Sequence, residues 1–396
     1  MKTAVWLYFF MFVAFFDLHA QYPILSPFAI SLGAAPSFIG LIMGMYSITH
    51  LPGNLIAGFS VDRYGSKRFI VLSLIFGGIM MLLQSLVTNP WQLLAVRSMS
   101  GFVLAFLSPA CLAMLAKMAR DHIHQGKLMA GNGLVHTLAS VVSPAAGAYL
   151  VAQVGFMTAF HVLGWVLIAT GVFAIFGIKS TSAVQAERDI AVGEKKTPLR
   201  KGKLIMPPPD GSPVPWLFYG LPLAISCSQG ILFFELPLIG QSSGNASIMD
   251  TGILFSVVSL GALLTLSLLF LNRVSAFIRT ASGSFALALI FFGMAANWPL
   301  PLTMSLLLIG MAKGVIFPAL ASLLLSLSGG VRHGRVFSLL SIAFSLGSFM
   351  GPMLAGHFRD QVSPFYLAFV VLMTALTIFP VYLIRSRDFS NASSGH

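Results

Sequence analysis

Long apolar segments follow one another along the whole chain and leave little sequence between them. Each approaches or exceeds the roughly 20 residues that an α-helix needs to cross a bilayer. Only 9% of the residues are charged, against roughly 25% in soluble domains. The pattern therefore predicts an all-α, polytopic membrane protein. Its twelve apolar segments fall at about 5–33, 37–60, 69–86, 91–117, 128–151, 156–177, 215–240, 248–270, 280–297, 301–327, 336–356 and 364–384.

Basic residues gather in every second connection between these segments. The formal net charge is +12, but the charges are spread over short connections and do not form the basic face that nucleic-acid binding requires. Connections that follow even-numbered segments carry most of the lysine and arginine, whereas those that follow odd-numbered segments are nearly uncharged. Because basic connections stay in the cytoplasm, both termini are predicted to be cytoplasmic, and no nucleic-acid partner is expected.

The composition changes in the middle of the chain. Residues 178–214 are rich in charged residues and in proline, which predicts a cytoplasmic linker. It joins an N-terminal six-helix bundle, 1–177, to a C-terminal bundle with a short cytoplasmic tail, 215–396. The two halves repeat each other weakly; Pro27, for example, matches Pro237. Two pseudo-symmetric halves of six helices are a known transporter architecture, with the substrate site near the midplane between the halves.

A short polar stretch, 58–68, separates the second apolar segment from the third. Its spacing, G-x-x-x-D-R-x-G-x-K/R-R, closely resembles the signature loop between helices 2 and 3 of the major facilitator superfamily of secondary transporters. The resemblance implies a gating loop with a charge lock between helices, in which Asp62 is the acceptor. Glycines at these positions would allow close contact and unusual backbone angles, and the basic residues would meet anionic headgroups. The stretch contributes Gly58, Asp62, Arg63, Gly65, Lys67 and Arg68.

Two further patterns resemble motifs of the same family. Arg97-x-x-x-Gly101 is similar to its arginine motif in the fourth helix, and two other sites look like the glycine-proline motif of antiporters. Small residues four positions apart let helices pack closely, and proline favours a bend. The first of these two sites, 143–147, has Ser143 where the motif usually has glycine. The residues predicted for packing and bending are Ser143, Pro144, Gly147, Gly351 and Pro352.

Four ionisable residues interrupt segments 1, 4, 7 and 10, which line the central cavity in the resembled fold. They are Asp17, Arg97, Glu235 and Lys313. Each costs about 2.5–3.5 kcal/mol at a helix centre, so we expect ion pairs or a wet cavity. Similar depths in their segments suggest that Asp17 pairs with Lys313 and Arg97 with Glu235. Gln21 follows Asp17 by one helical turn and shares its face. These residues are the predicted proton-coupling and substrate site.

The predicted function is secondary transport of a small solute by alternating access. Proton-coupled export of a small, amphipathic molecule is the main hypothesis. Uptake or efflux of a polar metabolite or metal chelate is the alternative, and a non-transporting membrane sensor is the alternative from another class. The chain has no H-E-x-x-H or G-x-x-x-x-G-K-[ST] pattern, which disfavours a zinc-dependent hydrolase or an ATP-driven pump.

The same reasoning predicts the surroundings of the protein. No metal site is suggested, because the two cysteines, Cys111 and Cys227, lie inside apolar segments. No cofactor is expected, and a proton gradient would supply the energy. We expect a monomer in the bacterial cytoplasmic (inner) membrane, with the lipid bilayer and a small-molecule substrate as its partners.

Overall fold

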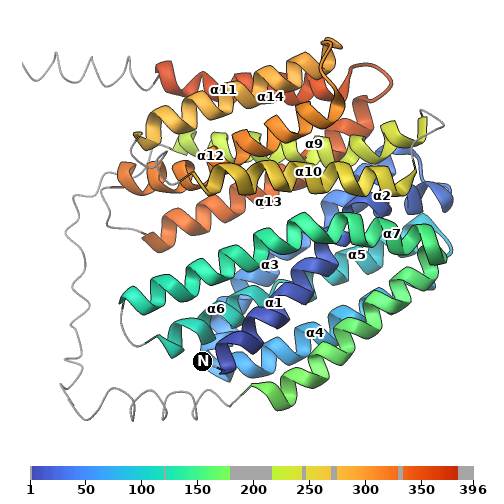
Figure 1. Ribbon diagram of the computed structural model, residues 1–396, viewed down its shortest axis with the longest axis vertical. Helices are drawn as coiled ribbons and strands as arrows, with labels where there is room; N and C mark the ends of the chain where they lie inside the picture. The colour runs from blue at the N-terminus through green and yellow to red at the C-terminus, as the bar shows by residue number, and fades with distance from the viewer. Residues whose placement is uncertain are drawn as a thin grey trace, which may run out of the picture. The chain divides into compact units, whose positions relative to one another are not determined.

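The computed structural model describes residues 2–119, 122–178, 216–242, 247–268, 274–328 and 333–381 (Figure 1). Over these ranges the chain is helical and contains no strand. The helices form two compact units, and each is described here by itself. The predicted all-α class is confirmed.

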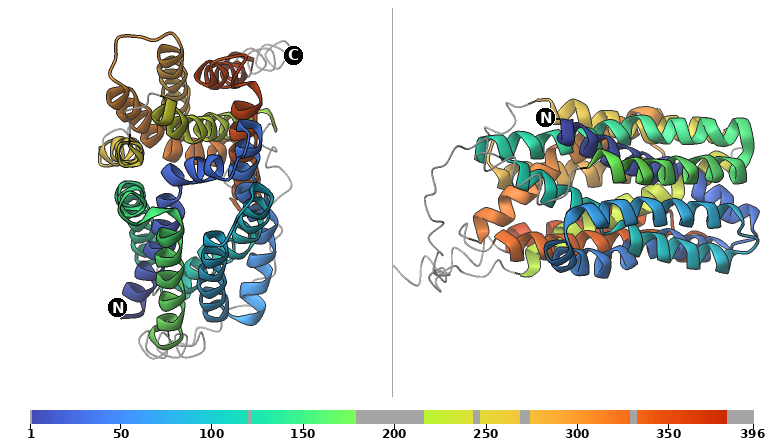
Figure 2. Two further views of the ribbon diagram at one scale, coloured as in Figure 1. Left: turned by 90° about the vertical axis from the view of Figure 1, so that its right-hand side faces the viewer. Right: turned by 90° about the horizontal axis from the view of Figure 1, so that it is seen from below.

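The first unit contains the helices of the N-terminal half, together with residues 236–256. Helix α7 (His122–Gly177) packs along both α1 (Lys2–Ala20) and α4 (Ser66–Ser85), and α3 (Pro36–Tyr64) packs along α5 (Pro90–Leu104) (Figure 2). Two predicted segments merge in α7, where the backbone is non-helical at Gly155, with φ 77°. The other helices of the first unit are α2 (Tyr22–Ser31) and α6 (Leu107–Met118).

Two predicted segments each consist of two helices. Helices α1 and α2 meet at Gln21 with a bend of 44°, and α5 gives way to α6 after Ala105 and Phe106. A proline stands shortly after each break: Pro23 in α2 and Pro109 in α6. Proline has no N–H and its ring clashes with the carbonyl four residues earlier, which explains the break at both places.

The second unit contains residues 216–235 and the helices from residue 257 onward. The sequence prediction assigned all of 215–396 to one bundle, and those boundaries stay a prediction. This unit contains a 3₁₀ turn η1 (Trp216–Tyr219), α11 (Ala276–Ala295), α12 (Leu302–Leu327), α13 (His333–Phe358) and α14 (Pro364–Leu376). Helices α9 (Gly220–Ser242) and α10 (Ile248–Leu266) are divided between the two units.

Most of these helices are suited to a membrane. Among the described residues, nine helices are long and apolar enough to cross one, or ten if the bent pair of α1 and α2 forms one span. Helix α7 counts once among the nine although it covers two predicted segments. Helix α3 is not among them, and Thr49, His50 and Asn54 interrupt its apolar run. The chain is a multi-pass integral membrane protein.

Small residues bring helices close together within each unit. A Cβ on Gly147 in α7 would lie 2.5 Å from the carbonyl oxygen of Ala20 in α1. In the second unit a Cβ on Gly351 in α13 would overlap the carbonyl oxygen of Cys227 in α9. Ser143 is buried and donates to the carbonyl of its own helix at Ala139, 2.6 Å away. These positions pack closely, as their spacing predicts.

The proline of each small-residue motif lies inside a continuous helix. Pro144 is within α7 and Pro352 within α13, and neither helix ends there. Pro352 instead packs against α9 at Gly230. A Cβ added to Gly230 would lie only 2.7 Å from the Cδ of Pro352. A gating role for these prolines stays a prediction.

Candidate functional site

A buried polar cluster forms where α1 ends. Gln21, at the break between α1 and α2, donates from Nε2 to Asp17 Oδ2 at 3.1 Å and accepts at Oε1 from Arg97 Nη1 at 2.7 Å. Asp17 and Gln21 are each 1% exposed, and Arg97 in α5 is 3% exposed. The amide of Gln21 therefore links a carboxylate to a guanidinium inside one bundle. The shared face predicted for Asp17 and Gln21 is present in the structure.

The cluster has two further members that the sequence analysis missed. Gln84 in α4 is 1% exposed and donates to Gln21 Oε1 at 3.5 Å, which is a long hydrogen bond. Tyr46 in α3 presents its ring to Arg97, with the guanidinium carbon 4.9 Å from the ring centroid, the arrangement of a cation–π contact. The aromatic residue gave no charge signal in the sequence, and the glutamine lies in a segment without ionisable residues.

Two atoms of this cluster lack a partner. Asp17 Oδ1 and Arg97 Nε are buried, and among the described residues neither has a hydrogen-bond partner. Most buried polar atoms in proteins are paired, and an unpaired one costs about 1–3 kcal/mol, more when charged. Catalytic groups and sites of ordered water or ions are among the places where such unpaired buried atoms occur.

Glu235 has a partner that its sequence position does not predict. Arg359, just after the end of α13, donates from Nε to Glu235 Oε2 and from Nη2 to Oε1, each at 3.1 Å. Glu235 is 6% exposed, so this two-pronged ion pair neutralises a nearly buried carboxylate. Depth along a helix does not fix its rotation, and an arginine in a connection can reach back into the bundle. The predicted pairing of Glu235 with Arg97 would join the two units and stays a prediction.

Lys313 faces aromatic rings in its own unit. Its Nζ lies 5.6 Å from the ring centroid of Phe233 and 5.9 Å from that of Phe317. These are cation–π distances, and among the described residues no ion pair to Lys313 is present. The predicted pairing of Lys313 with Asp17 would join the two halves and stays a prediction.

The predicted gating stretch is almost entirely helical. Helix α3 continues to Tyr64 and α4 begins at Ser66, so the turn is made by Gly65 alone, with φ 90°. This φ favours glycine, as the sequence indicated. Gly58 differs from the expectation of close contact, because no described atom lies within 4 Å of a Cβ placed there.

The charged residues of this stretch have distinct surroundings. Lys67 donates to the carbonyl oxygen of Ile175 at 2.6 Å, and the last carbonyls of a helix such as α7 need an outside donor. Arg63 and Arg68 are exposed, which suits contact with headgroups. The side chain of Asp62, the predicted acceptor of the charge lock, lies outside the described part of the structure.

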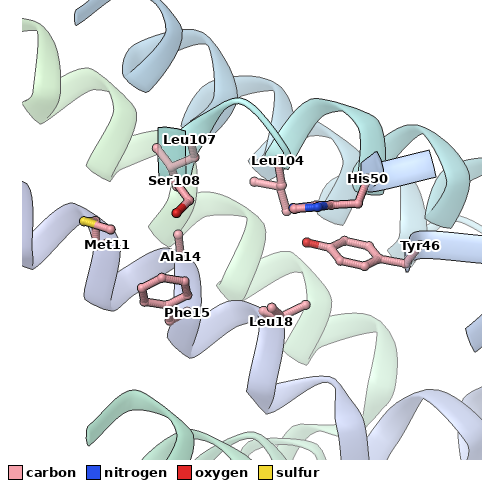
Figure 3. A pocket seen from close by; sticks show the side chains of 9 residues that line it. All are labelled: Met11, Ala14, Phe15, Leu18, Tyr46, His50, Leu104, Leu107 and Ser108. Carbon is pink, nitrogen blue, oxygen red and sulfur yellow. The ribbon is translucent and has the colours of Figure 1, made fainter. Parts of the chain in front are cut away.

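A small cavity lies in the first unit beside the polar cluster. It measures about 60 Å³ and is lined mainly by apolar side chains of α1, α3, α5 and α6 (Figure 3). Tyr46 belongs to both the polar cluster and the cavity, because its ring contacts Arg97 and also lines the cavity. Elsewhere in the described ranges, no group of three or more His, Cys, Asp and Glu side chains could hold a metal ion.

The family model of the Major Facilitator Superfamily matches residues 7–295. The chain belongs to the major facilitator superfamily. Solved structures of this fold resemble it over almost its full length. A bacterial homologue of the human lysosomal transporter Spinster gives a TM-score of 0.71 at 15% identity, covering 99% of this chain and 96% of its own. The xylose transporter XylE of E. coli gives 0.69 at 14% identity, covering 96% and 94%.

Relatives of this superfamily member include proteins named for drug resistance. Multidrug resistance protein 2 of Bacillus subtilis is 22% identical over 386 residues, which are 96% of this chain and 94% of that protein. Multidrug resistance protein MdtG of Escherichia coli is 26% identical over 320 residues, 78% and 76% of the two chains. The chain is thus a secondary transporter with the major facilitator fold, and the predicted family and fold are confirmed.

Proposed function

We propose that this transporter exports small amphipathic molecules from the bacterial cytoplasm in exchange for protons. The observation that carries the proposal is the buried carboxylate of Asp17, held through Gln21 to Arg97. Ionisable groups at this depth are costly and mark ion pathways. The resemblance to proteins named for multidrug resistance supports export and a broad range of substrates.

In this proposal Asp17 carries the proton, and Gln21 transmits the change in the charge of Asp17 to Arg97 through its two hydrogen bonds. An ionised Asp17 accepts from Gln21 Nε2, and Gln21 Oε1 accepts from Arg97. Protonation of Asp17 removes the negative charge nearest to this chain of hydrogen bonds. Arg97 then becomes the uncompensated charge of the cluster, which favours a conformation in which it meets water or another acceptor. Proton binding and the choice of access state are linked in this way.

We propose the same surroundings that the sequence indicated. Both termini lie in the cytoplasm, the protein works as a monomer in the cytoplasmic membrane, and the proton gradient is the only energy source. The residues proposed for proton coupling and substrate binding are Asp17, Gln21 and Arg97 in the first unit, and Glu235 and Lys313 in the second. The basic connections support the orientation, since they are retained on the cytoplasmic side.

Purified full-length protein in proteoliposomes tests this function. With a pH gradient imposed, we expect ethidium and tetraphenylphosphonium to be moved against their own gradients, and nigericin to stop that movement by collapsing the pH difference. A polar metabolite and a metal chelate run in parallel should not move. Movement of only these polar compounds would overturn amphipathic export, and movement that persists with nigericin would overturn proton coupling.

A further inference from the structure

The cavity in the first unit has a mostly apolar wall with polar groups in two places. Side chains such as Ala14 from α1 and Leu107 from α6 form the wall, and Tyr46, His50 and Ser108 supply the polar groups. Figure 3 shows the hydroxyls of Tyr46 and Ser108 turned toward the same space. Pockets for small molecules have this composition, mostly apolar with a few placed polar groups.

The two hydroxyls that line the cavity are available to a ligand. Within the described ranges neither the hydroxyl of Tyr46 nor that of Ser108 makes a hydrogen bond to protein. His50 is held at Nδ1 by the amide nitrogen of Asn54, 2.9 Å away. Because an amide N–H₂ group only donates, His50 Nδ1 accepts, and the ring proton is on Nε2. The hydroxyl of Tyr46 or of Ser108 can therefore bind an oxygen atom of a ligand.

The size of the cavity limits what can enter it. A water molecule needs roughly 10–15 Å³ on this measure, so a cavity of about 60 Å³ holds a group of about four to six non-hydrogen atoms. The apolar wall disfavours a chain of waters, each of which needs two to four polar partners. An apolar group with a single oxygen matches the apolar wall and one of the two hydroxyls.

We propose that this cavity is a substrate subsite for a short branched or cyclic apolar group that bears one hydroxyl or ether oxygen. The subsite rests on the proposed export function and narrows its substrate class. Tyr46 connects it to the coupling cluster, because the same ring lies 4.9 Å from the guanidinium of Arg97. A group that binds Tyr46 thus contacts the residue that positions Arg97, which links substrate binding to the state of Asp17.

Two compounds of equal size test the subsite on the purified full-length protein. Cyclopentanol and methylcyclopentane differ only by a hydroxyl in place of a methyl group, and melting temperature reports their binding to the folded state. We expect cyclopentanol to raise the melting temperature of the wild type more than methylcyclopentane does. Ser108→Ala should weaken cyclopentanol binding roughly fivefold, the loss of one hydrogen bond. Ala14→Leu should fill the cavity and abolish both shifts.

A matched variant and a transport assay distinguish failure of the subsite from failure of the export function. Ala152→Leu makes the same change at an exposed position of α7 and should keep both shifts. Equal shifts in wild type and Ala14→Leu, or no shift in the wild type, would overturn the subsite even if ethidium is transported. Clear shifts with no gradient-driven transport of any compound would leave the subsite standing and overturn the export function.

Discussion

Arg97→Met reduces pH-gradient-driven transport by roughly 100-fold. The substitution removes the donor to Gln21 Oε1 and the cation that faces Tyr46, and it takes from the buried carboxylate of Asp17 the cation that Gln21 links to it. Such a carboxylate is expected to stay protonated in the membrane, so it can no longer release its proton in each cycle. Uptake of ethidium into proteoliposomes under an imposed pH gradient measures the effect.

Two other arginine variants control this result. Arg335→Met makes the same change at an exposed position of α13 and should keep transport near the wild-type rate. Arg97→Lys keeps the charge but lacks the planar fork that both reaches Gln21 and stacks on Tyr46, so an intermediate rate is expected. Gradient-driven transport near the wild-type rate in Arg97→Met, with an unchanged melting temperature, would remove Arg97 from the coupling path.

Gly310→Ala lowers the stability of the second unit by about 3 kcal/mol. Gly310 in α12 faces α10, and a Cβ at this position would overlap the carbonyl oxygen of Val258 and lie 3.1 Å from the nitrogen of Ala262. The backbones of two helices would have to move apart. The loss exceeds the gain of about 1 kcal/mol in helix propensity that alanine brings. The melting temperature of the purified protein measures the change.

Gly58→Ala is the matched control for this prediction. It makes the same substitution in α3, where no described atom lies within 4 Å of the new Cβ. Its stability should stay the same or rise slightly, because only the helix propensity changes. Equal melting temperatures for Gly310→Ala and the wild type would contradict the close approach of α10 and α12.

Much of the fold could be predicted from the sequence because membrane helices have a strong pattern. Apolar length alone located the helices, and the glycine spacing of 58–68 located Gly65, whose φ of 90° makes the turn between α3 and α4. The breaks in the first and fourth segments were not predicted, although Pro23 and Pro109 carry the signal. Proline is common in membrane helices and does not break each one, as the continuous α7 at Pro144 shows.

The site was predictable only in part. Asp17, Gln21 and Arg97 stand out because charge and polarity are rare in apolar segments, and the structure brings these three together. Their neighbour Tyr46 could not be singled out, since an aromatic residue is ordinary in a membrane helix. The partner of Glu235 could not be predicted either, because Arg359 lies in a connection and its reach depends on the tertiary arrangement.

The most direct test of proton exchange measures protons released when substrate binds. Ethidium is added to purified protein in weakly buffered detergent solution, and a pH indicator records the release. If substrate and proton compete through Asp17, the wild type should release about one proton per bound ethidium, and Asp17→Asn should bind ethidium and release none. Binding by the wild type without proton release, or equal release by Asp17→Asn, would contradict the proposed coupling.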